Sequence, residues 1–272
     1  MPVIAPKQCG RMEKKMKISI ITGASSGMGR QFARMIDKID ECDEIWVIAR
    51  RSKRLEELSD ELSTKVRPVS ADLSKEDSYS LICDMLREEK EKNPDFYVET
   101  LVNAAGYGKF GKFTELTLSE QLGMVDLNLK ALIAITHIVL PYMQKGSKVY
   151  QLGSLSSFQP VPYIGVYGAT KAAVLSFTRA VNKELNDRGI KMIAVCPGWV
   201  ATEFFDRAVK DDTITYYNKF FTADEVVRCA IKDYYKGKDV SVCGASIRAQ
   251  VLLTKLLPHK LVMNIWCHQQ KK

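Results

Sequence analysis

A chain of 272 residues that is 46% hydrophobic and 26% charged can bury a large core, which excludes wholesale disorder and favours one large domain over two small ones. Its formal charge of +8 is spread among acidic residues along most of the chain, so we expect no nucleic-acid partner. Seven cysteines without a CxxC pair argue against a structural metal site and indicate a reducing, cytoplasmic setting.

Residues 1–16 contain no long apolar run of the secretory kind, and we expect them to form a disordered extension inside the cell. Beyond them, β-branched apolar runs alternate with stretches whose apolar residues recur at helical spacing. We predict strands within residues 18–21, 45–48, 66–69, 101–102, 149–152, 192–195 and 240–242, and helices over 29–38, 55–62, 77–92, 122–143, 166–185 and 223–235.

Strands and helices that alternate in this way form βαβ units, whose strands are parallel and buried on both faces. We therefore expect a single-domain, Rossmann-like α/β fold over residues 17–245, with a doubly wound parallel sheet of about seven strands and helices on both faces. Residues 246–272 are expected to add a basic amphipathic helical extension. No segment offers about 20 uninterrupted apolar residues, so we expect no spanning helix, and contact of the extension with an anionic membrane surface is an alternative.

The first predicted strand runs into the glycine-rich loop TGASSGMG, residues 22–29, and a helix follows directly. Gly23 permits a tight turn, Gly27 lets the backbone approach a pyrophosphate, and Gly29 lets the helix pack on the strand. Because the loop also aims the N–H groups of the helix at negative charge, it predicts a dinucleotide site. The loop residues assigned to the cofactor are Gly23, Ser25, Ser26, Gly27, Met28 and Gly29.

The second predicted strand ends in Arg50 and Arg51, where an NAD site usually presents a carboxylate to the ribose. Guanidinium groups suit a 2′-phosphate, so we favour NADP(H) over NAD(H); the alternative is that both arginines begin a solvated loop. Asp72 and Leu73 follow the third strand. There the carboxylate of Asp72 either accepts from the adenine amino group or caps the next helix.

Tyr167 and Lys171 lie four residues apart in a predicted helix, so they share one of its faces. Ser154 follows the fifth predicted strand, at the same edge of the sheet. Reduction of a carbonyl builds negative charge on its oxygen, so such a site needs a proton donor and a second hydrogen-bond donor. Taken singly, Ser154 is a typical turn residue and Lys171 a typical exposed helix charge.

Six motifs resemble those of the short-chain dehydrogenase/reductase family, in the family's order and spacing over about residues 17–202. The resemblance implies an oxidoreductase that passes hydride between NADP(H) and a ketone or secondary alcohol. The motifs are TGASSGMG at 22–29, NAAG at 103–106, Asn128, Ser154, YGATK at 167–171 and PGWVAT at 197–202.

The resemblance also implies catalytic roles. Tyr167 would transfer the proton while Ser154 holds the substrate oxygen. Lys171 would bind the ribose and lower the pKa of the phenol, which is about 10 in a free tyrosine. Asn128 would hold a water that relays protons to Lys171.

The same resemblance completes the cofactor site. Asn103 would tie the central strands together, Ala104 to Gly106 would leave room for the adenosine, and Thr202 would bind the nicotinamide carboxamide. Ser26 departs from the family pattern, because NADP-preferring relatives often carry a basic residue there, so cofactor preference rests on Arg50 and Arg51. The cofactor residues assigned beyond the loop are Arg50, Arg51, Asp72, Leu73, Asn103, Ala104, Ala105, Gly106, Tyr167, Lys171, Pro197, Gly198, Val200 and Thr202.

Aromatic residues that follow strands four to six predict an apolar substrate pocket. A bulky, hydroxysteroid-like ketone or alcohol suits it; a 3-oxoacyl-carrier-protein reductase and a non-catalytic NADP(H)-sensing module are the alternatives. The expected pocket residues are Ser154, Tyr107, Phe110, Leu155, Phe158, Tyr163, Trp199, Phe204 and Phe205.

Residues 202–222 resemble the mobile lid of the family. A homodimer or homotetramer through residues 122–143 and 166–185 is expected, since small residues in the second segment permit close helix contact. The chain departs from the family pattern past residue 236, where a longer basic tail puts the tetramer in doubt.

Overall fold

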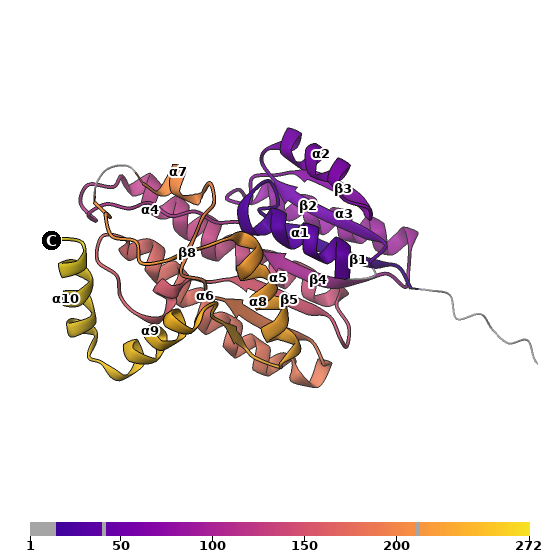
Figure 1. Cartoon of the computed structure of the whole chain (residues 1–272). Coiled ribbons are helices and arrows are strands. Elements are labelled where there is room, and N and C mark those ends of the chain that lie inside the picture. Colours follow the sequence, from indigo (N-terminus) through magenta and orange to yellow (C-terminus); the bar gives the residue numbers. More distant parts are fainter. Residues whose placement is uncertain (1–14, 40–41, 210–212) are drawn as a thin grey trace, which may run out of the picture.

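The computed structural model describes residues 15–39, 42–209 and 213–272, so the predicted N-terminal extension lies almost wholly outside the described residues. Seven strands form the central sheet: β1 (Lys17–Thr22), β2 (Glu44–Ala49), β3 (Lys65–Ser70), β4 (Tyr97–Asn103), β5 (Lys148–Leu152), β6 (Lys191–Val195) and β9 (Val240–Ser241). All neighbours pair in parallel, in the order β3-β2-β1-β4-β5-β6-β9 (Figure 1).

Helices cover both faces of this sheet (Figure 1), which confirms the predicted doubly wound fold. On one face α1 (Gly27–Ile39), α2 (Ser52–Glu61) and α8 (Ala223–Tyr235) pack their apolar sides onto the strands. On the other face lie α3 (Asp77–Lys92) and α5 (Ala131–Val139). The inner strands β1, β2, β4, β5 and β6 are rich in apolar residues and largely buried from both sides, whereas the edge strand β3 is largely exposed.

The strand register positions the functional edge. Thr22 at the end of β1 pairs with Ile48 on one side and with Asn103 on the other, so three strands end together. The Thr22 hydroxyl accepts from the backbone of Ala104 (3.1 Å) and Ala105 (3.2 Å). It thereby fixes the chain that leaves β4 against the start of the glycine-rich loop.

The helix predicted over residues 122–143 is interrupted. It consists of α4 (Leu118–Val125), a π-helical turn η1 (Asp126–Lys130), α5 and a 3₁₀ turn η2 (Leu140–Tyr142). Leu118–Tyr142 is long and apolar enough to cross a membrane by length and composition, with a mean hydropathy of 1.5 in its best window. Here α5 packs on β4 and α3, and α4 packs on α6 (Gly165–Glu184), so the run serves as a core helix of the fold.

The chain beyond β9 forms two helices in the segment expected to be a helical extension. Pro258 separates α9 (Ala245–Leu256) from α10 (His259–Gln269), because proline lacks the N–H that would continue the first helix. The two helices fold back along the functional edge (Figure 1). Gln270 secures them: its side-chain oxygen accepts from the backbone of Thr215 (2.9 Å) and Tyr216 (3.0 Å).

The remaining elements lie above the sheet edge. A two-stranded parallel sheet joins β7 (Trp199–Val200) and β8 (Phe220–Phe221), and α7 (Phe204–Ala208) lies between them in the chain. The helix α7 and the strand β8 fall within the segment expected to form a lid, 202–222, of which residues 210–212 lie outside the described residues, and β7 directly precedes that segment.

Candidate active site

The glycine-rich loop adopts the backbone conformations that its glycines were predicted to supply. Gly23 and Gly27 have positive φ angles of 67° and 54°. A Cβ on Gly23 would lie 2.7 Å from the backbone nitrogen of Ala105, and one on Gly29 would lie 2.4 Å from the carbonyl oxygen of Gly23. Any residue larger than glycine is therefore excluded at Gly23 and Gly29. The N-terminus of α1 borders the groove at the sheet edge.

This groove has a volume of about 710 Å³ and is basic at one end. Arg51 donates from Nη2 to the hydroxyls of Ser26 (2.8 Å) and Ser25 (3.1 Å), which couples the end of β2 to the glycine-rich loop. Arg51 therefore contributes the positive charge that Ser26 itself lacks. Arg207 stacks on Tyr107, with its guanidinium carbon 3.7 Å from the ring centroid. Burial, followed by the nearby charge of Arg50, lowers the pKa of Arg207.

Asp72 borders the same groove and stabilises the turn after β3. Its carboxylate accepts from the Ser74 backbone (3.1 Å) and hydroxyl (2.8 Å). Burial alone would raise its pKa, but the bonds from Ser74 and the charge of Arg50 lower the pKa of Asp72 overall. Asp72 therefore does not cap α3 directly but stabilises the turn that precedes this helix.

Most predicted cofactor residues border the groove or the cavity beside it. Asn103 does not: its side-chain amide donates to Thr136 and Gln151 (3.0 Å each) beneath the edge, so it ties β4 to β5 and α5. Arg54, Lys109, Glu203 and Arg207 also border the groove and were not predicted. Of the predicted set, Gly23, Ser25, Ser26, Gly27, Met28, Gly29, Arg50, Arg51, Asp72, Leu73, Ala104, Ala105, Gly106 and Thr202 line the groove, and Tyr167, Lys171, Pro197, Gly198 and Val200 line the cavity.

Asn128 lies in the π-helical turn and is fully buried. Its side-chain oxygen accepts from the Tyr107 backbone (2.9 Å), and its nitrogen donates to the Tyr107 carbonyl (2.8 Å) and to Thr170 (3.2 Å). Both amide protons are therefore used within the chain. The π-helical turn places this amide where it fixes the loop after β4 to the helix α6 that carries Tyr167.

Tyr167, Lys171 and Ser154 come together where the groove meets the cavity. The Ser154 hydroxyl is hydrogen-bonded to the phenol of Tyr167. The Lys171 ammonium lies 5.7 Å from the centroid of the Tyr167 ring and donates to the Leu152 carbonyl at 2.6 Å. One turn of α6 separates the tyrosine from the lysine, as the spacing of four predicts.

Burial is the main cause of the pKa shifts in this trio. Burial raises the pKa of Tyr167 to about 12, although its hydrogen bond with Ser154 acts in the opposite direction. Burial lowers the pKa of Lys171 to about 8. The expected lowering of the phenol pKa by Lys171, together with the positive ring of an oxidised nicotinamide, stays a prediction.

An apolar cavity of about 350 Å³ opens beside Tyr167. Phe158 and Tyr163 are not among the residues that line it. Phe158 packs against the core with Lys255 over its ring, and Tyr163, at a positive φ of 69°, packs in the apolar cluster to which Trp199 and Phe204 of the cavity wall belong. The predicted residues that do line the cavity are Tyr107, Phe110, Ser154, Leu155, Trp199, Phe204 and Phe205.

The C-terminal helices supply a wall of this cavity that was not predicted. Trp266 of α10 stacks on Trp199 with ring centroids 6.4 Å apart, and its indole nitrogen donates to the Pro162 carbonyl at 3.1 Å. An amphipathic tail that contains a tryptophan was the available signal, but its apolar face did not reveal what it packs against. The tail residues that line the cavity are Gln250, Leu253, Thr254, Leu257, Val262, Ile265, Trp266 and Gln269.

Comparison with known proteins bears directly on this site. The family model described as short chain dehydrogenase matches residues 17–213, which include the glycine-rich loop and the Ser154–Tyr167–Lys171 trio. The chain belongs to the short-chain dehydrogenase family. As a short-chain dehydrogenase it is an NAD(P)-dependent oxidoreductase.

Three relatives of this short-chain dehydrogenase are informative. Sulfoacetaldehyde reductase 2 of Chromohalobacter salexigens is 36% identical over 193 residues, which cover 69% of this chain and 74% of the relative. A solved short-chain dehydrogenase from Sphingobium yanoikuyae in complex with NADPH has a TM-score of 0.74 at 28% identity, over 87% of this chain and 92% of that one. A solved enzyme from Burkholderia phymatum in complex with NAD has a TM-score of 0.74 at 20% identity, over 89% and 94%.

The residues of this short-chain dehydrogenase fit a nicotinamide dinucleotide. The α1 N-terminus and the arginines supply donors for phosphate groups at one end of the groove. At the other end the groove shares Gly106, Tyr107 and Thr202 with the cavity that Tyr167 lines. A dinucleotide lying along the groove would thus end beside the phenol.

Proposed function

We propose that this short-chain dehydrogenase uses NADPH to reduce a bulky, apolar, hydroxysteroid-like ketone, with Tyr167 as the proton donor. The observation that carries the proposal is the position of the Tyr167 phenol, bonded to Ser154, at the junction of a basic groove and an apolar cavity. A carbonyl in the cavity meets a proton donor there, and a nucleotide in the groove meets cationic side chains.

The chemistry follows from these side chains. With its pKa raised to about 12, the phenol of Tyr167 is protonated at neutral pH, which suits donation to a carbonyl oxygen rather than abstraction from an alcohol. Ser154 orients the phenol, and its hydroxyl can donate a hydrogen bond to the substrate oxygen as negative charge develops there. Lys171 would hold the ribose, and the bound nicotinamide would supply the hydride.

The preference for NADP(H) is part of the proposal and rests on the basic end of the groove. Arg51 lies against both serines of the glycine-rich loop, and Arg50, Arg54 and Arg207 border the same space. Four guanidinium groups that border one dinucleotide groove favour a cofactor with an additional phosphate.

Arg51→Ala is expected to weaken NADPH binding about 10- to 100-fold, as loss of a charge-assisted contact predicts, and to change NADH binding much less. Titration of nicotinamide fluorescence with both cofactors measures the effect. Arg34→Ala is the matched control, since Arg34 is an exposed arginine that pairs with Glu61 away from the groove. Equal losses for the two cofactors would remove Arg51 from phosphate recognition.

The cavity supports a neutral, apolar substrate. Among the described residues that line it, Lys171 is the one cationic side chain, and the wall is otherwise aromatic, aliphatic or uncharged. A small acidic carbonyl of the kind named for the Chromohalobacter relative would lack a guanidinium partner there. The aromatic wall of Trp199, Phe205 and Trp266 instead offers contact area.

Trp266→Ala is expected to raise the KM for bulky apolar ketones about 10- to 100-fold, because hydrophobic contacts of this size set substrate discrimination in enzyme pockets. The KM for a small aliphatic ketone should change little, and Trp266→Phe should retain most of the wall. Steady-state kinetics on both ketones would check this. An equal rise in KM for both ketones would show that Trp266 stabilises the fold and does not contact the substrate.

A panel of ketones, alcohols and acyl thioesters, assayed by nicotinamide absorbance with both cofactors, tests the proposed function. We expect turnover of bulky apolar ketones with NADPH. Preferential turnover of 3-oxoacyl thioesters would favour the acyl-carrier-protein reductase instead. NADPH binding without turnover of any substrate would favour the sensing module.

Assembly and compartment also belong to the proposal. Family members are commonly oligomeric. We assign the contact to α4, α5 and α6, where Leu122 is 52% exposed and Ile133 39% exposed, as a homodimer or homotetramer would require. A cytoplasmic location is supported by the reduced thiols of Cys83, Cys196, Cys229, Cys243 and Cys267.

A further inference from the structure

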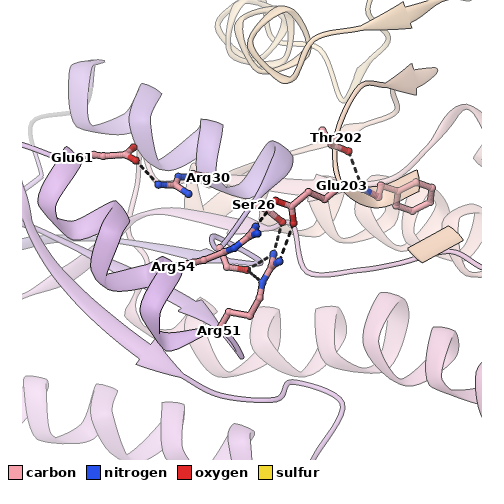
Figure 2. Close-up of polar contacts among 9 residues, drawn as sticks. Ser26, Arg30, Arg51, Arg54, Glu61, Thr202 and Glu203 are labelled. Carbon is pink, nitrogen blue, oxygen red and sulfur yellow. Dashed lines mark hydrogen bonds and ion pairs between the residues drawn. The ribbon is translucent and has the colours of Figure 1, made fainter. Parts of the chain in front are cut away.

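Glu203 reaches across the mouth of the groove to its arginines (Figure 2). It directly precedes α7, on the segment that follows β7, whereas its partners lie at the start of α2. One carboxylate oxygen accepts from Arg51 at 2.9 Å, and the other accepts from Arg54. The contact joins parts of the chain about 150 residues apart.

The two arginines form a seat for an anion, and Glu203 occupies it. Arg51 bonds Ser25 and Ser26 of the glycine-rich loop with the same guanidinium that it offers to Glu203 (Figure 2). Hydrogen bonds from Arg54 and then Arg51 hold the pKa of Glu203 below its usual value. A carboxylate between two guanidinium groups, beside a hydroxyl of the loop, has the same donors that a phosphate monoester would use.

We propose that Glu203 competes with the 2′-phosphate of NADP(H) for Arg51 and Arg54, so that binding of this cofactor displaces Glu203 and releases α7 from the groove. This inference rests on the proposed NADP(H) preference. NAD(H) carries no 2′-phosphate, so it leaves the Glu203 contacts in place. Glu203 is thereby a specificity-determining residue that lowers the affinity for the phosphorylated cofactor.

The displacement would be transmitted to the substrate cavity through the next residue. The Phe204 ring lies 5.6 Å from the Tyr167 ring and 6.2 Å from the Phe110 ring, measured between centroids. A Cβ on Gly108 would lie 2.8 Å from Phe204, so this ring is closely packed. Because Phe204 borders both groove and cavity, a shift of the backbone at Glu203 would also move a wall of the substrate site.

Glu203→Gln tests the competition, and Glu61→Gln is its matched control. Glu61 is the last residue of α2 and also pairs with two arginines, Arg34 and Arg30 of α1 (Figure 2 shows the contact with Arg30), but it does not border the groove. Dissociation constants for NADPH and NADH are measured by fluorescence titration of the full chain. Because exposed ion pairs are individually weak, we expect Glu203→Gln to raise the NADPH-over-NADH preference about three- to tenfold, and Glu61→Gln to leave it within about twofold.

A double-mutant cycle separates this inference from the proposed function. In the Arg51→Ala background, Glu203→Gln should lose most of its effect, because one of the two competing contacts is already absent. An unchanged or reduced preference in Glu203→Gln, alongside a clear NADPH loss in Arg51→Ala, overturns the competition and leaves the proposed function standing. If wild-type protein prefers NADH and Arg51→Ala alters nothing, both are overturned.

Discussion

Tyr167→Phe is expected to lower kcat/KM for ketone reduction about 10²- to 10⁴-fold, the range over which a positioned general acid acts. The phenol is the group that meets the carbonyl, and its pKa of about 12 keeps it protonated throughout the neutral range. Phenylalanine preserves the ring that packs 5.6 Å from Phe204, so the cavity wall is retained. Initial rates by nicotinamide absorbance measure the loss.

Cofactor affinity distinguishes a chemical effect from a structural one. NADPH should bind Tyr167→Phe within a few-fold of wild type, since the hydroxyl is the only group removed. Turnover equal to that of wild type would eliminate Tyr167 as the proton donor. A parallel collapse of NADPH affinity would instead indicate that the hydroxyl supports the groove.

Lys171→Met is expected to lower kcat/KM about 100-fold or more and, at the same time, to stabilise the fold at pH 7. Lys171 is 5% exposed, and burial lowers its pKa to about 8 from 10.5. Below pH 8 Lys171 is protonated in both the folded and the unfolded state. Burial of this charge therefore lowers the free energy of unfolding by at most roughly 3 kcal/mol. Loss of the bond to the Leu152 carbonyl offsets about 1 kcal/mol of the gain.

The stability difference between Lys171→Met and wild type should depend on pH in a defined direction. Between about pH 8 and pH 10.5 the unfolded chain binds the proton of Lys171 more tightly than the folded chain does, so this group makes wild-type protein more stable as pH rises. The stability advantage of Lys171→Met should therefore shrink across this window. Urea unfolding of both proteins at pH 7 and pH 10 tests the point, and an advantage that grows with pH would contradict it.

The fold and the centre of the site were accessible from sequence for identifiable reasons. Strands buried on both faces need nearly continuous apolar residues, so runs such as 45–48 marked them clearly. Gly23, Gly27 and Gly29 are required by backbone geometry that admits no side chain, and Tyr167 with Lys171 needs only the pitch of a helix. Each of these signals is local, so neighbouring letters suffice to reveal it.

The features that the sequence did not predict are mainly contacts between distant parts of the chain. Glu203 meets Arg51 across 152 positions, and Trp266 meets Pro162 across 104. The loop from β5 to α6 misled for a different reason: Tyr163 adopts a positive φ that a non-glycine residue seldom takes, so the direction of its side chain could not be inferred from alternation. The π-helical turn around Asn128 likewise contains no proline or glycine of its own that would mark it in the sequence.

The packing of α9 and α10 adds a cavity wall that lies outside the family match. That match ends at residue 213, before the segment that carries Leu253, Leu257 and Trp266. Agreement over the matched residues therefore does not fix this part of the cavity wall. Grafting the tail of one family member onto another would be a direct route to altered selectivity without disturbing hydride transfer.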